Sequence, residues 1–162
     1  MSSERKYTFL EAKAKLEMLC AVQERCSFEL NQKMKSWGIP QNDRDILLSH
    51  LVSQNFLSEE RFAEAFISGK FKIKKWGRIK IINGLKQKKI SDYSIKKGLK
   101  TIDSDVYWNQ LMHLGANKVK LIKEAKNDYP TRVKLYRFLN GRGYEQSLVH
   151  EAVEEILNQI EF

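Results

Sequence analysis

Apolar residues recur at intervals of three and four along the whole chain, and no stretch sustains a strict alternation of apolar and polar residues. This spacing is typical of amphipathic helices and argues against strands. Only two prolines, Pro40 and Pro130, and eight glycines interrupt the 162 residues. The sequence therefore predicts an all-α protein with nine helices and no strand.

Capping residues, prolines and glycines set the expected ends of these helices. Leu57-Ser58-Glu59-Glu60 is the clearest start, because Ser58 can cap the helix and the two acids lie at the positive end of its dipole. For the seventh helix we expect Val106, Trp108, Leu111, Leu114 and Ile122 on the buried side. The expected helices cover residues 8–23, 27–34 with Ser27 as the cap, a stretch after Pro40 through 54, 58 to the break at 74–77, 78–88, a stretch from 91 or 92 through 99, 103 or 104 to 126, 129–140, and 145 or 146 to 160.

The second helix of each expected group of three repeats along the chain with shifts of 51 and then 54 residues. The repeat places Gly38 opposite Lys89 and Gly143. Units that cannot bury an apolar face alone bury it by stacking on their neighbours. We therefore predict three tandem three-helix modules, at residues 1–56, 57–102 and 103–162. The aligned apolar positions are Leu30, Met34 and Ile39, then Ile81, Leu85 and Ile90, then Leu135, Leu139 and Tyr144.

Positive charge is concentrated between Lys70 and Lys100. This window holds twelve Lys and Arg residues and one acid, Asp92, for a net charge of +11, whereas the whole chain carries +9. A localised field of one sign attracts a polyanion and speeds its encounter. Like charges at helical spacing also repel one another unless an anion relieves them. The window therefore favours nucleic acid or an acidic protein surface as partner, and the alternative for any single lysine is a solvated side chain.

Nothing in the sequence proposes a catalytic, metal or cofactor site. Cys20 and Cys26 lie six apart, without a second Cys or a His at ligand spacing, so we interpret both as buried apolar residues. The three histidines are scattered over three expected helices, and no motif of nucleophilic or phosphate-binding chemistry is visible. No signal peptide or membrane span is visible. We expect a cytoplasmic, monomeric protein without a cofactor, a membrane partner or an enzymatic activity.

Three groups of residues resemble the RecX family of recombinase regulators. The first is Leu57-Ser58-Glu59-Glu60-Arg61-Phe62-Ala63, followed by Gly77-Arg78-Ile79 and then Leu85 and Ile90. The others are Arg137-Phe138-Leu139 with Gly141 and Gly143-Tyr144, and Ser27-Phe28-Glu29-Leu30 with Lys33-Met34 and Gly38. The resemblance spans about residues 7–160. Two departures are Lys89, where the family usually has glycine, and Asn83-Gly84, a weak helix former in mid-helix.

The resemblance implies an elongated, curved protein of three modules that binds the RecA recombinase filament. It implies a stoichiometric modulator that lodges in the filament groove, restrains ATPase, strand exchange or filament growth, and in some members binds single- or double-stranded DNA. We expect two sets of basic residues to contact the filament or nucleic acid. The main set is Lys70, Lys72, Lys74, Lys75, Arg78, Lys80, Lys86, Lys88 and Lys89, and the second is Lys118, Lys120, Lys123, Lys126, Arg132, Lys134 and Arg137. Trp37 and Trp76, at helix ends, are interpreted as packing residues in preference to base-stacking ones.

Two alternatives stay open. One is an autonomous DNA-binding protein of the helix-turn-helix kind, although its basic residues would extend over two helices and a loop without a compact base-reading set. The other is an all-α scaffold for a different acidic protein.

Overall fold

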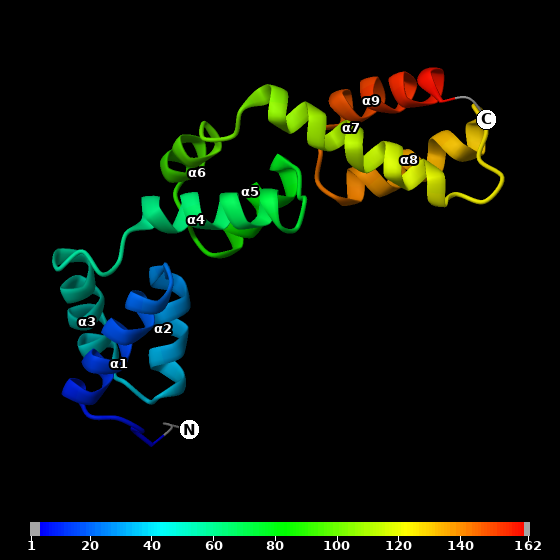
Figure 1. Ribbon diagram of the computed structural model, residues 1–162. Helices are drawn as coiled ribbons and strands as arrows, with labels where there is room; N and C mark the ends of the chain where they lie inside the picture. Colours follow the sequence, from blue (N-terminus) through cyan, green and yellow to red (C-terminus); the bar gives the residue numbers. More distant parts are fainter. Residues whose placement is uncertain (1–3, 161–162) are drawn as a thin grey trace. The chain divides into compact units, whose positions relative to one another are not determined.

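The computed structural model describes residues 4–160. Within this range every regular element is a helix, so the predicted all-α fold is confirmed. The expectation that the chain starts without a signal peptide also involves residues 1–3, which lie outside the described range. The helices of Figure 1 are α1 (Phe9–Val22), α2 (Ser27–Ser36), α3 (Gln41–Ser53), α4 (Glu59–Lys72), α5 (Arg78–Gln87), α6 (Asp92–Leu99), α7 (Ser104–Leu121), α8 (Tyr129–Gly141) and α9 (Gln146–Gln159).

The chain divides into two compact units. Unit 1 contains the residues up to 65 together with 85–97, and unit 2 contains 66–84 together with the residues from 98 onward. The borders of the units therefore fall inside α4, α5 and α6. The division into modules at residues 57 and 103 stays a prediction.

Unit 1 is built around the three helices α1, α2 and α3, which Figure 1 shows packed together. Thr8 opens α1 with a capping box, in which its hydroxyl accepts the N–H of Glu11 and its own N–H donates to the Glu11 carboxylate. Tyr7 and Trp37 pack edge to face at 5.2 Å beside this core. The core residues are Ala12, Leu16, Cys20, Leu30, Met34, Ile39, Leu47, Leu51 and Leu57.

Unit 2 contains α7, α8 and α9, which pack on one another (Figure 1). Gly115 faces α9, because a Cβ atom at this position would collide with the Ile156 side chain. A glycine therefore lets α7 approach α9 closely. The buried residues of these three helices are Tyr107, Leu111, Gly115, Val119, Thr131, Leu135, Leu139, Val149, Ala152, Val153, Ile156 and Leu157.

The backbone supports the repeat register that the sequence predicts. All nine aligned apolar positions are buried. The residues aligned with one another at the end of the second helix, Gly38, Lys89 and Gly143, all have positive φ, at +73°, +60° and +91°. This left-handed conformation suits glycine and strains other residues. Lys89 therefore occupies a glycine-type position, as its departure from the family pattern suggested.

The predicted cap Ser58 is confirmed, and of the pairs that the sequence left open, Ser91 or Asp92 and Asp103 or Ser104, the first residue is the cap in each. The Ser58 hydroxyl accepts the N–H of Arg61 at 3.3 Å, and the Ser91 hydroxyl accepts that of Ser94 at 3.3 Å. Asp103 caps α7 through two backbone N–H groups. The prediction for α2 was wrong, because Cys26 is the N-cap and Ser27 is already helical.

The prediction for α7 was wrong in its length and partly in its phase. The helix ends at Leu121, not at Lys126, because residues 122–128 turn the chain into α8. Asp128 caps α8 and Thr131 accepts the Lys126 N–H, which fixes this turn. Val106, expected inside, is 53% exposed. The buried stripe follows a spacing of four that passes through a tyrosine and a glycine, namely Tyr107, Leu111, Gly115 and Val119.

Candidate functional site

The predicted basic residues lie on helices α4, α5, α7 and α8 and on the segments that follow them. Three of them, Lys86, Lys88 and Lys89, belong to unit 1, and the others belong to unit 2. Unit 2 therefore contains basic residues from both predicted sets. Those classed as exposed are Lys72, Lys74, Lys75, Lys86, Lys89, Lys120, Lys123, Lys126, Lys134 and Arg137, while Lys70, Arg78, Lys80, Lys88, Lys118 and Arg132 are half-buried.

The loop between α4 and α5 is held by hydrogen bonds to its backbone. Arg142 Nη1 donates to the Lys74 carbonyl at 3.2 Å, and the Tyr144 hydroxyl donates to the Lys75 carbonyl at 3.0 Å. In return the Gly77 N–H donates to the Arg142 carbonyl at 2.8 Å. These bonds use the main chain of the loop and leave the Lys74 and Lys75 side chains exposed.

Glycines allow the close approach on which this loop depends. A Cβ atom on Gly77 would lie 2.5 Å from backbone atoms of Gly143 and Tyr144. The N–H of Ile79 donates to the Gly143 carbonyl at 2.9 Å, so the start of α5 is bound to the end of α8 by main-chain contacts. The backbone positions of Lys74 and Lys75 are therefore set by hydrogen bonds, while their side chains are exposed.

Trp76, in the same loop, is half-buried and lies close to two lysines. Lys70 Nζ is 4.8 Å and Lys80 Nζ is 4.7 Å from a centroid of its ring system. Cations over a tryptophan ring are attracted by its quadrupole. Gly84 also has a packing role here, because a Cβ atom at this position would lie 2.8 Å from the Phe66 ring. The weak helix former in α5 thus makes room for an aromatic side chain.

Arg78 has structural partners. Its Nη1 lies 2.7 Å from Glu145 Oε2, and its guanidinium carbon lies 3.8 Å from the centroid of the Tyr107 ring. The Tyr107 hydroxyl donates to the other Glu145 oxygen and accepts the Arg78 N–H at 3.0 Å. Burial and the bond to Glu145 raise the pKa of Tyr107 well above its usual range. The rings of Phe71 and Tyr144 lie against Tyr107 at 5.9 and 5.2 Å.

Two further members of the predicted sets form ion pairs. Lys88 pairs with Glu29 within unit 1. Arg132 donates to both carboxylate oxygens of Glu154, at 2.7 and 3.0 Å, a bidentate arrangement that raises the pKa of Arg132 and lowers that of Glu154. Paired cations contribute less to an external field than unpaired ones, because the neighbouring carboxylate offsets their charge.

Part of the second basic set lines a hollow on α7 and α8. Four of its members, Lys118, Lys123, Lys134 and Arg137, line this hollow, whose volume is about 490 Å³. Its remaining lining residues are apolar, namely Leu121, Ile122 and Phe138. Lys120 and Lys126 are exposed and Arg132 is paired, and none of these three is among the lining residues.

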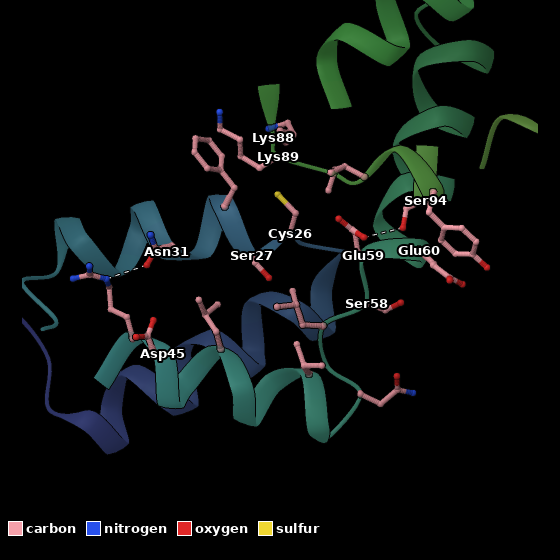
Figure 2. Close-up of a pocket in the computed structure, with 18 of the residues that line it drawn as sticks. Cys26, Ser27, Asn31, Asp45, Ser58, Glu59, Glu60, Lys88, Lys89 and Ser94 are labelled. Carbon is pink, nitrogen blue, oxygen red and sulfur yellow. Dashed lines mark hydrogen bonds between the residues drawn. The ribbon is translucent and has the colours of Figure 1, made fainter. Parts of the chain in front are cut away.

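Unit 1 contains a larger groove, of about 940 Å³, between α2, α3 and the segment around residues 88–94 (Figure 2). Cys26 and Lys89, which line it, occupy the repeat positions that Gly77 and Gly143 occupy in unit 2. At one wall Glu59 accepts the Ser91 N–H at 2.8 Å and the Ser94 hydroxyl at 2.8 Å. Partial burial alone would raise the pKa of Glu59, but these bonds and one from the Ser91 hydroxyl hold it below its ordinary value.

Cys20 and Cys26 are buried free thiols, as expected, and desolvation raises the pKa of both. Among residues 4–160, no cluster of three or more His, Cys, Asp or Glu side chains could hold a metal ion. Within the same range, none of the helices has the combination of length and apolarity that a membrane crossing requires.

Sequence reasoning missed the residues that position the loop. Tyr107, Arg142 and Glu145 were not predicted to be important, although they contact Arg78 and the backbone of the basic loop. The spacing of four residues between Tyr107 and Leu111 could have predicted that Tyr107 is buried. No local pattern connects Glu145 with Arg78, because 67 residues separate them.

Two family models match the chain over most of its length. The model of the second three-helix domain of RecX matches residues 58–99, and that of the third three-helix domain matches residues 105–153. The chain belongs to the RecX family. The fold prediction of tandem three-helix modules is thereby confirmed.

Individual RecX proteins extend this result. The regulatory protein RecX of Clostridium botulinum strain Eklund 17B is 28% identical over 131 residues, which cover 80% of this chain and 61% of that relative. The chain thus spans about three fifths of the length of such clostridial relatives. RecX of Prosthecochloris aestuarii is 25% identical over 136 residues, which cover 84% and 87% of the two chains. The crystal structure of RecX from Lactobacillus salivarius shares the fold, with a TM-score of 0.77 at 16% identity over 94% of this chain and 97% of that one.

Proposed function

We propose that this RecX-family protein is a non-catalytic regulator of homologous recombination that binds the RecA filament and modulates its ATPase and strand-exchange activities. The observation that carries the proposal is the basic loop between α4 and α5, which presents exposed lysines from a backbone fixed by hydrogen bonds. Membership of a family of regulatory proteins supports the same function.

A fixed loop suits a partner with regularly placed negative charges. A recombinase filament on DNA offers two such elements, its phosphates and the acidic patches of its protein. Because the loop backbone is already ordered, binding orders only the lysine side chains, which lowers the entropic cost of association. We therefore assign the first contact to Lys72, Lys74 and Lys75.

The proposed contact set excludes the basic residues that form ion pairs with carboxylates of this chain. Arg78, Lys88 and Arg132 form ion pairs with Glu145, Glu29 and Glu154. Replacing one of them would leave a carboxylate without its partner and confuse a loss of binding with a loss of stability. The remaining proposed contacts are Lys70, Lys80, Lys86, Lys89, Lys118, Lys120, Lys123, Lys126, Lys134 and Arg137.

The test is a titration of recombinase ATP hydrolysis with this protein at two salt concentrations. The wild type should slow hydrolysis at substoichiometric to stoichiometric ratios, and the triple variant Lys72→Glu, Lys74→Glu, Lys75→Glu should lose this effect. A matched variant reverses three exposed lysines of unit 1, Lys6, Lys15 and Lys33, with the same change of net charge. It should retain the effect, and circular dichroism should show both variants to be equally helical. No change in ATPase or filament length with the wild type would refute the proposal.

Direct DNA binding is the competing function, favoured by the same exposed lysines. If DNA is the sole partner, affinity for duplex DNA should need no recombinase and should fall steeply with salt. Loss of three phosphate contacts in the Lys72, Lys74, Lys75 variant would then reduce the slope of log affinity against log salt by about 2.7. Salt-dependent DNA binding combined with an unchanged ATPase would select this function over filament regulation.

A further inference from the structure

The hollow on α7 and α8 is lined by four basic side chains, Lys118, Lys123, Lys134 and Arg137, which we call its rim, and by Leu121, Ile122 and Phe138, which we call its floor. Its rim carries four basic side chains, and of the described residues none with an acidic side chain lines it. Leu121, at the end of α7, contributes to the floor and is 80% exposed. A partner that covered this leucine would remove apolar area from water, which is favourable.

The aromatic residue of the floor is already occupied by cations. Lys118 Nζ lies 5.1 Å and the Arg142 guanidinium carbon lies 5.2 Å from the centroid of the Phe138 ring. A nucleobase that stacked on this ring would have to displace a cation that the ring attracts. The free apolar surface of the hollow is therefore aliphatic, with Leu121 as its most exposed part.

We propose that the hollow binds an acidic peptide segment of a partner protein, with carboxylates on the rim and one aliphatic side chain against Leu121. Charge complementarity selects the carboxylates, and the aliphatic floor selects a partner with an apolar side chain. Phosphates of a nucleic acid could satisfy the rim, but they would leave Leu121 uncovered. The proposal deepens the proposed function, on which it rests, by assigning the type of partner surface that this hollow recognises.

The surface around Lys72, Lys74 and Lys75, at the end of α4 and in the following loop, provides a comparison of similar composition on other elements of unit 2. The loop presents cations around the half-buried Trp76, whose ring lies within 5 Å of Lys70 and Lys80. Ile73, on the loop, is 78% exposed and provides a matched apolar control for Leu121. The two surfaces can therefore be altered separately with equivalent substitutions.

The test uses two fluorescein-labelled synthetic peptides of equal charge and length, without recombinase or DNA. One alternates Asp and Glu with two leucines, and the other replaces both leucines with serine. In anisotropy titrations the leucine peptide should bind the wild type at least about tenfold more tightly than the serine peptide. Leu121→Ser should remove this preference, and Ile73→Ser should leave it unchanged. The pair Lys134→Glu and Arg137→Glu should weaken binding of both peptides at least about tenfold at low salt.

Three results would overturn the proposal: equal affinity for the two peptides, full competition by an oligo-dT strand at equal charge, or an unchanged preference in Leu121→Ser. Amide chemical-shift changes outside residues 118–142 on peptide addition would overturn it as well. The substituted residues Leu121, Ile73, Lys134 and Arg137 are all exposed, so the variants should keep the fold. The same spectra check that they do. A recombinase without response to the protein would refute the proposed function and leave the peptide result standing on its own.

Discussion

Arg78 Nη1 lies 2.7 Å from Glu145 Oε2, and the hydroxyl of Tyr107 bonds both to the same carboxylate and to the Arg78 backbone. A half-buried residue from the most basic part of the chain is thus part of the hydrogen-bond network that holds unit 2 together. Its position at the start of α5 connects the stability of this unit with the placement of the neighbouring lysines.

Replacement of Tyr107 by phenylalanine should destabilise the protein by about 1–3 kcal/mol, because the Arg78 N–H and the Glu145 carboxylate lose a buried partner. Urea unfolding followed by circular dichroism measures the change as a lower midpoint at constant slope. Tyr93→Phe, at an exposed tyrosine, should shift the free energy of unfolding by less than about 0.5 kcal/mol. Equal effects of the two substitutions would contradict the role assigned to Tyr107.

Alanine at Gly77 should destabilise the protein by about 1–3 kcal/mol, since its Cβ would lie 2.5 Å from the backbone of Gly143 and Tyr144. Gly141 is a matched control in α8, because no heavy atom lies within 4 Å of a Cβ built there. Gly141→Ala should be neutral or stabilise by up to about 1 kcal/mol. Thermal unfolding distinguishes the two, and a harmless Gly77→Ala would show that the loop can move away.

Glycine at Lys89 should raise stability by up to about 1 kcal/mol, because the residue has a φ of +60° that strains a side chain with a Cβ. Lys86→Gly removes the same charge from within α5 and should lower stability by about 1 kcal/mol. The opposite signs of the two effects, measured by urea unfolding, separate backbone strain from charge. A loss of stability in Lys89→Gly would contradict the strain.

Glutamine at Glu59 should destabilise the protein at pH 7 by about 1 kcal/mol, through weaker bonds to Ser91 and Ser94. The pKa of Glu59 is lowered in the folded state, so its contribution is present above the ordinary value of 4.5 and is lost as pH falls through the lowered one. The difference between wild type and variant should therefore shrink below pH 4.5. Glu151→Gln, at an exposed residue of α9, should show no such convergence.

Helix order and the repeat were predictable because both depend on local patterns. Leu30, Ile81 and Leu135 recur in register, and Ser58 and Asp103 cap their helices by contacts within three residues. The phase of α7 was harder to predict. Its buried stripe includes Gly115, whose place inside follows from the distant Ile156 side chain and not from its own polarity.

Which basic residues belong to the site was predictable, but which of them are exposed and which are paired with carboxylates was not. Lys74 and Arg78 look alike in a count of charges. The first is exposed, whereas the second is bound to Glu145, a residue 67 positions away. Long-range pairing of this kind leaves no trace in spacing or composition.

The main-chain contact of Gly77 with Gly143 also bears on how unit 2 unfolds. In a protein made of repeats, stability is the sum of terms within each repeat and terms for each neighbouring pair. The bonds from Gly77 and Ile79 to the end of α8 belong to the second kind. Residues 77–79 and 142–144 should therefore gain and lose amide protection together, as one cooperative element built from two distant parts of the sequence.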